Sequence, residues 1–306
     1  MDDGRTERAA DTHGEPTRSV AIVTDGDHPD LTDDGRAIAA ALEAAGTVAE
    51  PFVWTDGAAD PDHYDAFLFR SCWDYHADYD RFSSFLDTVE AADTAVFNPV
   101  DVVRWNAHKS YLTALSAAGV RTTPTVWFEA GDDASLAAVL RERGWTEAVI
   151  KPAVGAGSEG VWRTSVGAAA ADQRRFDGDL AERDTLVQRF VPAIESGERS
   201  IVFVRGEYSH AWNDLPRGDD FSAFKQRGLP YEPDEETVES ARNGLSTACE
   251  IVGCDPSELP YARVDYLEAD DGFVLMELEL IEPNLELGTA PGAAERLASA
   301  VTELLR

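Results

Sequence analysis

A glycine-rich segment between two β-type segments places the strongest constraint on what this chain can fold into. Lys151 ends a short apolar run, and Gly155, Gly157 and Gly160 follow it. This spacing matches the GxGxxG pattern of dinucleotide-binding folds, where a helix must follow so that its N-terminus meets the pyrophosphate. Residues 161–164 (VWRT) are instead β-type sequence. We therefore predict a loop that joins two strands, which excludes a Rossmann-type site.

Three interpretations of this loop remain open. A glycine loop can fold over a polyphosphate, because its backbone N–H groups are accessible and Lys151 adds positive charge. A nucleophile elbow around Ser158 is a second interpretation, although that geometry also requires a following helix. A glycine hairpin without a ligand is the third, and it leaves Lys151 unexplained.

Lysine is rare in this chain. Lys109, Lys151 and Lys225 are the only three lysines, against 58 acidic residues. Lysine supplies a compact point charge on a flexible stem, which the planar arginine fork does not replace where a phosphate must be reached. Lys109 opens a helical pattern and Lys151 precedes the glycines. Both are therefore candidate phosphate ligands.

The charge of the chain excludes several classes of partner. A formal net charge of -32 and a pI near 4.3 argue against binding nucleic acid or an anionic membrane. Such self-repulsion is tolerated when salt screens it, so the composition predicts halophilic adaptation. No apolar run approaches the roughly 20 residues of a membrane span. Residues 1–18 are polar and lack a signal-peptide core, so we predict a disordered acidic tail on a cytoplasmic protein.

The periodicity of the chain predicts alternating elements up to about residue 97 and a strand-rich pattern after residue 147. The first part indicates a small α/β layer with a parallel sheet. Helices are expected at 33–45, 79–91, 107–118, 132–143, 235–252 and 293–305. Strands are expected at 19–24, 48–54, 66–69, 95–97, 124–128, 148–151, 161–164, 185–190, 200–204, 207–213, 262–268 and 273–280.

Two strands near the C-terminus carry paired charges. Arg263 and Asp265 alternate on one strand, and Glu277 and Glu279 alternate on the next. Period 2 places each pair on one face, and the two faces can coincide in an antiparallel hairpin. Three carboxylates on one face suit Mg²⁺ held together with phosphate oxygens. The alternative is a solvated acidic face, but the apolar residues between the acids favour the metal site.

Arg70 and Asp74 follow the expected strand at 66–69. Open α/β sheets bind ligands at the carboxyl ends of their strands. We therefore hypothesise that Arg70 holds a substrate carboxylate and that Asp74 lies beside it. The equally open alternative pairs Arg70 with a neighbouring acid and places Trp73 and Tyr75 in the core.

The order of these motifs resembles the ATP-grasp superfamily of the glutathione-synthetase type, over residues 19–306. Three stretches are similar more narrowly to O-ureido-serine cyclo-ligase-like proteins of cycloserine biosynthesis: residues 70–75 (RSCWDY), 105–106 (WN) and 277–284 (ELELIEPN). The resemblance implies an ATP-grasp fold of mixed α/β and α+β class. Its parts would be the tail (1–18), an N-terminal α/β substrate-side domain (19–104), lobe 1 with the glycine hairpin (105–192) and lobe 2 with the Mg²⁺ site (193–306).

The resemblance also implies roles for individual residues. Lys109 and Lys151 would contact ATP phosphates, with Lys151 and Arg263 acting in catalysis. The glycine hairpin would contribute Gly155, Gly157, Ser158 and Gly160, and the adenine segment would contribute Gln188, Arg189, Phe190 and Val191. Glu198 would bind the ribose, and Asp265, Glu277 and Glu279 would hold Mg²⁺.

The implied activity is an ATP-dependent carboxylate–amine ligation through an acyl phosphate, either within one molecule or between two. ATP and Mg²⁺ are the implied cofactors, with two ions expected and Mn²⁺ as an alternative metal. The partners would be a small-molecule carboxylate and amine, and a homodimer is compatible with the sequence. An ATP-binding regulator without ligase turnover is the alternative function, and a thiol acceptor is a third.

The chain departs from the family pattern at two places. Glu279 stands where many relatives have asparagine, so Glu282 or Asn284 is a further candidate ligand. Where relatives tend to show Asp-Phe-Arg-x-Gln in a loop, residues 220–225 read DFSAFK, with Ser222 at the arginine position. Lys225 is the candidate replacement for that charge at the substrate.

Overall fold

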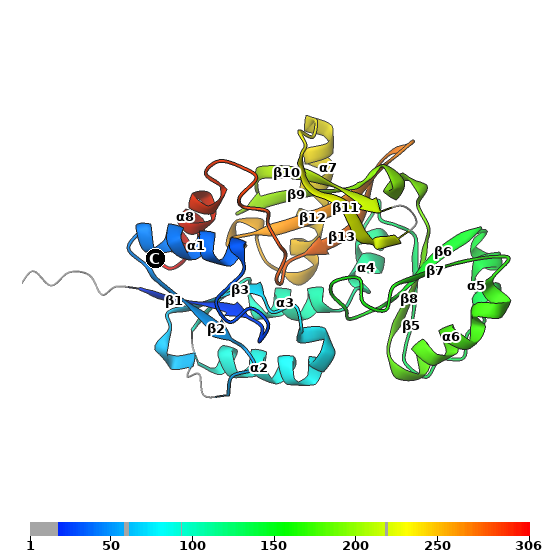
Figure 1. The fold of residues 1–306 in the computed structure, drawn as a ribbon, viewed down its shortest axis with the longest axis horizontal. Coiled ribbons are helices and arrows are strands. Elements are labelled where there is room, and N and C mark those ends of the chain that lie inside the picture. The colour runs from blue at the N-terminus through cyan, green and yellow to red at the C-terminus, as the bar shows by residue number, and fades with distance from the viewer. Residues whose placement is uncertain (1–17, 58–60, 93, 218–219) are drawn as a thin grey trace, which may run out of the picture.

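The computed structural model describes residues 18–57, 61–92, 94–217 and 220–306, without the side chains of residues 217–225. The tail predicted at 1–18 lies almost wholly outside the described residues. Three sheets follow one another along the long axis of the molecule (Figure 1). This agrees with the mixed α/β and α+β class that the sequence predicts.

The N-terminal sheet is parallel, as its alternating pattern predicts. It comprises β1 (Ser19–Thr24), β2 (Val48–Val53), β3 (Ala66–Ser71) and β4 (Ala95–Phe97), in the order β2-β1-β3-β4. Helices α1 (Asp33–Ala44) and α8 (Ala293–Leu304) pack on one face, and α2 (Tyr79–Ala91) and α3 (Val100–Ala107) on the other. Both faces of the inner strands β1 and β3 are therefore buried, which explains the nearly continuous apolar sequence of these two strands.

The C-terminal helix belongs spatially to the N-terminal layer. Leu297 and Val301 of α8 share a buried cluster with Ile38 and Leu42 of α1. The chain thus returns to its starting layer after completing the central sheet (Figure 1). The division that places residues 193–306 in one lobe stays a prediction; α8 packs on α1 and also shares its buried cluster with Val202 and Trp212 of the central sheet.

The sheet farthest from the N-terminus carries the glycine loop. It contains β5 (Thr125–Phe128), β6 (Glu147–Pro152), β7 (Trp162–Ser165) and β8 (Thr185–Arg189), all antiparallel, in the order β5-β8-β6-β7. Helices α5 (Leu136–Arg143) and α6 (Ala169–Glu182) share its apolar cluster. The loop joins β6 to β7, which confirms that it connects two strands.

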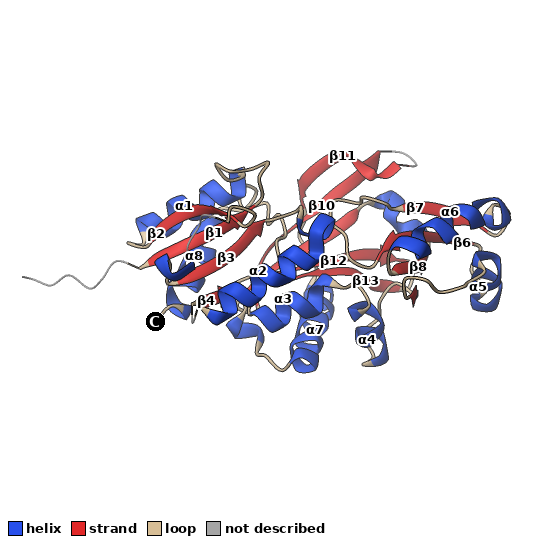
Figure 2. Ribbon diagram, turned by 90° about the horizontal axis from the view of Figure 1, so that it is seen from below, coloured by secondary structure: helices blue, strands red, loops and turns tan. Residues whose placement is uncertain are grey.

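The central sheet is antiparallel and has five strands. These are β9 (Glu198–Val204), β10 (Glu207–Arg217), β11 (Asp220–Pro230), β12 (Ala262–Ala269) and β13 (Gly272–Glu279), in the order β11-β10-β9-β12-β13. Helices α4 (Tyr111–Ala117) and α7 (Glu235–Val252) pack against it, and Figure 2 shows α7 beside α3 and α4. Short 3-10 turns lie at η1 (Pro61–His63), η2 (Tyr75–Asp78), η3 (Pro192–Ser196) and η4 (Pro256–Glu258).

The structure corrects several expected elements. The helix expected at 107–118 begins later, as α4 at Tyr111, and Lys109 lies in the turn between α3 and α4. Residues 220–225, expected in a loop, begin strand β11, which pairs with β10. Helices α3 and α6 were not expected at all. Among the described residues, no helix is both long and apolar enough to cross a membrane.

Candidate active site

A cavity of about 630 Å³ lies where all three sheets contribute residues. The glycine loop forms one wall, the β9–β12–β13 part of the central sheet forms another, and loops after β1 and β3 form the third. This position agrees with ligand binding at the carboxyl ends of parallel strands, because β1 and β3 both end here.

The charged residues of β12 and β13 face each other in register. Arg263 pairs with Glu279, and Asp265 pairs with Glu277. All four line the cavity. The shared face that alternation predicts is therefore present.

Glu277 holds both candidate phosphate lysines. Lys109 Nζ lies 2.8 Å from Glu277 Oε2, and Lys151 Nζ lies 2.6 Å from Oε1. The turn that carries Lys109 is fixed to the glycine loop, since its backbone N–H donates to the Ala153 carbonyl at 2.7 Å. Two lysines from separate elements thus converge on one carboxylate.

Arg263 joins the other two carboxylates. Its Nη2 lies 2.8 Å from Asp265 Oδ2 and 2.7 Å from Glu279 Oε1. The Ser200 hydroxyl donates to Asp265 Oδ1 at 2.6 Å. Because Asp265 is almost fully buried, these contacts replace the water that the carboxylate loses on folding.

The two lysines titrate differently although they share a partner. Burial lowers the pKa of each and is the largest single effect at Lys109, but Glu277, Tyr111 and Glu279 together outweigh it and leave the pKa of that lysine raised. At Lys151 burial and the neighbouring Lys109 dominate, so its pKa is lowered. The two ammonium groups in turn hold the pKa of Glu277 well below its ordinary value, against the effect of its own burial.

The surrounding carboxylates lack sufficient positive charge. Burial, together with Asp265 and Glu277, raises the pKa of Glu198 to about 8. Burial and the same two carboxylates raise the pKa of Glu279 to about 7, although Arg263 opposes them. Burial and the neighbouring Glu279 raise the pKa of Glu282 to about 8. Each of these acids would lose its proton more readily beside an added cation.

This donor set fits a hard divalent cation. Mg²⁺ prefers carboxylate oxygens, and the raised pKa values show where a cation would be stabilised. Within the described part of the chain, no three His, Cys, Asp or Glu side chains are already grouped closely enough to hold a metal ion. The head groups of Lys109, Lys151 and Arg263 contact the carboxylates instead.

The glycine loop closes over the cavity. Gly155, Gly157 and Ser158 line it, and Gly157 and Ser158 both have φ of 62°. Gly160 has φ of 73°, and a Cβ there would approach Pro152 Cγ to 3.1 Å. The loop also contacts the N-terminal domain, because Glu159 Oε2 lies 3.1 Å from His76 Nε2.

The predicted adenine segment lies outside this cavity. Gln188 is buried and donates to Thr125 Oγ1 at 2.9 Å, and Arg189 ends β8. The Phe190 ring lies 3.5 Å below the Arg163 guanidinium, and Val191 precedes η3. Glu198, the predicted ribose ligand, does line the cavity.

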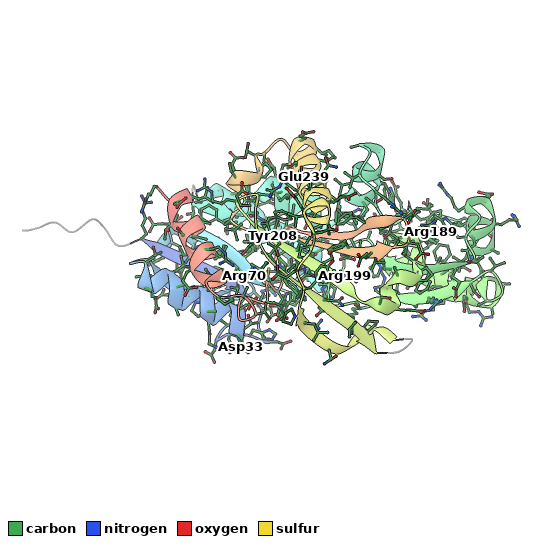
Figure 3. All side chains as sticks on the ribbon, turned by 90° about the horizontal axis from the view of Figure 1, so that it is seen from above. Asp33, Arg70, Arg189, Arg199, Tyr208 and Glu239 are labelled. Atoms are coloured by element: carbon green, nitrogen blue, oxygen red, sulfur yellow. The ribbon has the colours of Figure 1, made fainter. Side chains whose placement is uncertain are left out.

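The predicted substrate residues have three different outcomes. Asp74 lines the cavity and accepts from Trp54 Nε1 at 2.6 Å. Arg70 does not line it: the side chain is 2% exposed, stacks over the Tyr261 ring and donates to the Pro283 carbonyl. Figure 3 shows it on the side of the N-terminal layer, whereas Arg189 lies toward the far sheet. The Lys225 side chain is outside the described residues.

Several cavity residues were not predicted. Asp25 and His28 follow β1 and are joined by an Oδ1–Nδ1 contact of 2.7 Å. The carboxyl end of β1 could have indicated them, by the argument applied to β3. Arg227 of β11 also lines the cavity, two residues beyond the lysine proposed to supply that charge.

Comparison with known proteins identifies the family. Residues 20–98 match the model of the D-cycloserine synthetase DcsG N-terminal domain. The cycloserine biosynthesis protein DcsG of Streptomyces lavendulae is 31% identical over 298 residues, which cover 94% of this chain and 99% of the relative. The chain belongs to the DcsG family of ATP-grasp ligases.

Solved structures agree with this assignment. The crystal structure of D-cycloserine synthetase DcsG superposes with a TM-score of 0.86 at 30% identity, covering 94% of this chain and all of that one. The ATP-grasp ligase PsnB, complexed with Mg and ADP, has the same fold, with a TM-score of 0.65 at 16% identity over 94% of this chain and 99% of that one. The ATP-grasp fold, expected from motif order, is therefore confirmed.

Proposed function

We propose that this DcsG-family ligase activates the carboxyl group of a small amino-acid-like substrate as an acyl phosphate and joins it to an amine of the same molecule. The proposal rests on the β12–β13 face. Asp265, Glu277 and Glu279 lie on this face inside the cavity, and each of them contacts a lysine or arginine head group. The intramolecular step is taken from the similarity to D-cycloserine synthetase DcsG.

The reaction requires two displacements at one place. A substrate carboxylate oxygen attacks the γ-phosphorus of ATP and ADP leaves. The amine nitrogen then attacks the acyl carbon, loses a proton, and orthophosphate leaves with the C–O electron pair. Catalysis of this kind rests mainly on positioning and on neutralising dispersed charge.

The residues of this chain supply these functions in the following way. Lys109 and Lys151 exchange Glu277 for phosphate oxygens, and the glycine loop covers the phosphates with its N–H groups. Arg263 faces the transferred phosphoryl group. Asp265, Glu277 and Glu279, with Glu282 as a fourth donor, would hold Mg²⁺, which when bound neutralises phosphate charge. We propose that two ions bind, because Lys109, Lys151 and Arg263 supply too little positive charge for the buried carboxylates around them. We also propose that Mn²⁺ can substitute for Mg²⁺.

ATP and Mg²⁺ are supported by proteins of the same fold. PsnB was solved with Mg and ADP, and D-alanine–D-alanine ligase of Bacillus anthracis with ATP. A homodimer is a further proposal, which light scattering on the purified protein tests.

The test is ADP release with Mg²⁺, ATP and a panel of small molecules that carry both a carboxylate and a nucleophilic nitrogen. We expect release with one member of the panel, loss on adding EDTA, and loss of at least about 100-fold in Asp265→Asn and Glu279→Gln. Asp271→Asn is the matched control, because that carboxylate is 78% exposed at the turn of the same hairpin. Tight ATP binding without ADP release under any condition would instead favour the regulator.

A further inference from the structure

The segment after β13 has no regular secondary structure, although it is buried. Residues 280–286 lie outside any helix or strand, and Leu280, Ile281 and Leu285 are at most 2% exposed. Buried backbone carbonyls need hydrogen-bond donors, and a segment without a ladder must obtain them from side chains. The same segment carries Glu282, Asn284 and Glu286 into the cavity.

A row of side chains supplies these donors. Its members donate to, or lie within hydrogen-bond distance of, carbonyls from residue 278 to residue 285. In chain order the pairs are Asn106–Leu278 (2.7 Å), Asn98–Leu280 (2.7 Å), Tyr261–Ile281 (2.7 Å), Trp73–Glu282 (2.9 Å), Arg70–Pro283 (2.6 Å), Arg263–Asn284 (2.9 Å) and His210–Leu285 (2.7 Å). Six consecutive carbonyls, from Leu280 to Leu285, therefore have a side-chain partner.

Most of the row comes from the N-terminal half of the chain. Arg70 lies near the end of β3, Trp73 follows that strand, Asn98 follows β4, and Asn106 lies in α3. The amide of Asn106 holds the segment at two points, because its Oδ1 also accepts from the Leu280 N–H at 2.8 Å. The N-terminal half of the chain thus supplies four of the seven side chains that hold this stretch of main chain.

Trp73 has a special place in this row. It lines the cavity, and His28 packs against its ring edge-on at a centroid distance of 5.1 Å. Its indole N–H reaches the carbonyl of Glu282, whose carboxylate faces the same cavity. One hydrogen bond therefore joins the wall after β3 to the main chain of a residue whose carboxylate faces the cavity.

We propose that this row of donors positions the carboxylate-bearing segment 278–285 for ligation, with Trp73 as a positioning residue that acts through the main chain of Glu282. Only the kinetic part of this proposal rests on the proposed ligase function. It assigns the N-terminal domain a role in aligning the nucleotide site, in addition to binding substrate.

The test compares Trp73→Phe with Trp162→Phe. The first keeps an aromatic ring and removes the donor to Glu282. The second removes an equivalent indole hydrogen bond, 2.8 Å to Asp179 Oδ2 in the far sheet, and leaves segment 278–285 untouched. In the ligand-free protein we expect amide hydrogen exchange at residues 278–287 to be about tenfold faster in Trp73→Phe and unchanged in Trp162→Phe.

The kinetic half uses the substrate identified by ADP release. We expect kcat to fall about tenfold in Trp73→Phe while the KM for ATP changes less than about threefold, because the lysines and glycine loop are unaffected. Unchanged exchange at residues 278–287, exchange raised equally in both variants, or a kcat within about twofold of the parent would overturn the proposal. The hydrogen-exchange measurement needs neither nucleotide nor substrate. A negative exchange result is therefore distinguishable from a failure of the proposed ligase function.

Discussion

At the scale of single residues, ion pairs hold the charged side chains of the site together. Glu277 neutralises Lys109 and Lys151 where phosphate oxygens would otherwise do so, and Arg263 does the same for Asp265 and Glu279. A buried charge that loses its partner is strongly destabilising, whereas a satisfied pair contributes little net stability. The carboxylates therefore keep Lys109 and Lys151 buried at a tolerable cost.

This arrangement predicts an effect of Glu277→Gln on folding. Two ammonium groups would lose the carboxylate that they share, so we expect the free energy of unfolding to fall by about 3 kcal/mol. Chemical denaturation measures the change. Glu159→Gln is the control, because that carboxylate is 78% exposed and its loss should cost at most about 0.5 kcal/mol. Equal losses in the two variants would show that the lysines do not depend on Glu277.

At the scale of elements, local sequence patterns explain which helices and strands could be predicted, and distant contacts explain which could not. The β12–β13 face was predictable because alternation is a local property of a strand. Helix α3 was missed because its valines favour strands, and it forms where Val100 and Val103 pack on the N-terminal sheet. Helix α6 begins without a side-chain cap and contains Gly178, so it lacks the usual helix signals.

Arg70 shows why part of the site was not predictable from the sequence. The strand before it was expected to end at residue 69, but Arg70 lies inside β3, and its direction depends on Tyr261 and Pro283, about 190 residues or more away in the chain. The same distant segment gives Asn98 and Asn106 their partners. Contacts of this kind depend on how the layers pack, which local periodicity does not contain.

The glycine loop carries a prediction at this scale. Gly160→Ala places a side chain at φ of 73° and within 3.1 Å of Pro152 Cγ, so we expect a loss of about 1–2 kcal/mol of stability. The KM for ATP should also rise, because the loop would no longer settle over the phosphates.

Gly178→Ala in α6 is the opposite control. A Cβ there has open space around it, and alanine favours helix over glycine by about 1 kcal/mol. We expect this variant to be more stable, with an unchanged KM. If Gly160→Ala and Gly178→Ala changed the stability and the KM for ATP in the same way, the proposed role of the glycine loop in covering the phosphates would be contradicted.

At the scale of the whole molecule, the net charge of -32 sets the conditions under which the fold is stable. Salt screens repulsion between exposed carboxylates, so we expect the Tm to rise by about 10 °C or more between 0.1 and 2 M KCl. Sucrose at matched osmolality should give a smaller rise, because it leaves the charges unscreened. A Tm that is independent of KCl would contradict salt adaptation.

The central claim is that the substrate carboxylate attacks the γ-phosphate. The most direct test supplies the substrate with both carboxylate oxygens as ¹⁸O and measures the mass of the orthophosphate released during turnover. The acyl-phosphate route predicts one ¹⁸O in each orthophosphate, because the bridging oxygen comes from the carboxylate and leaves with phosphorus. Orthophosphate without label, at a rate equal to product formation, would contradict the account.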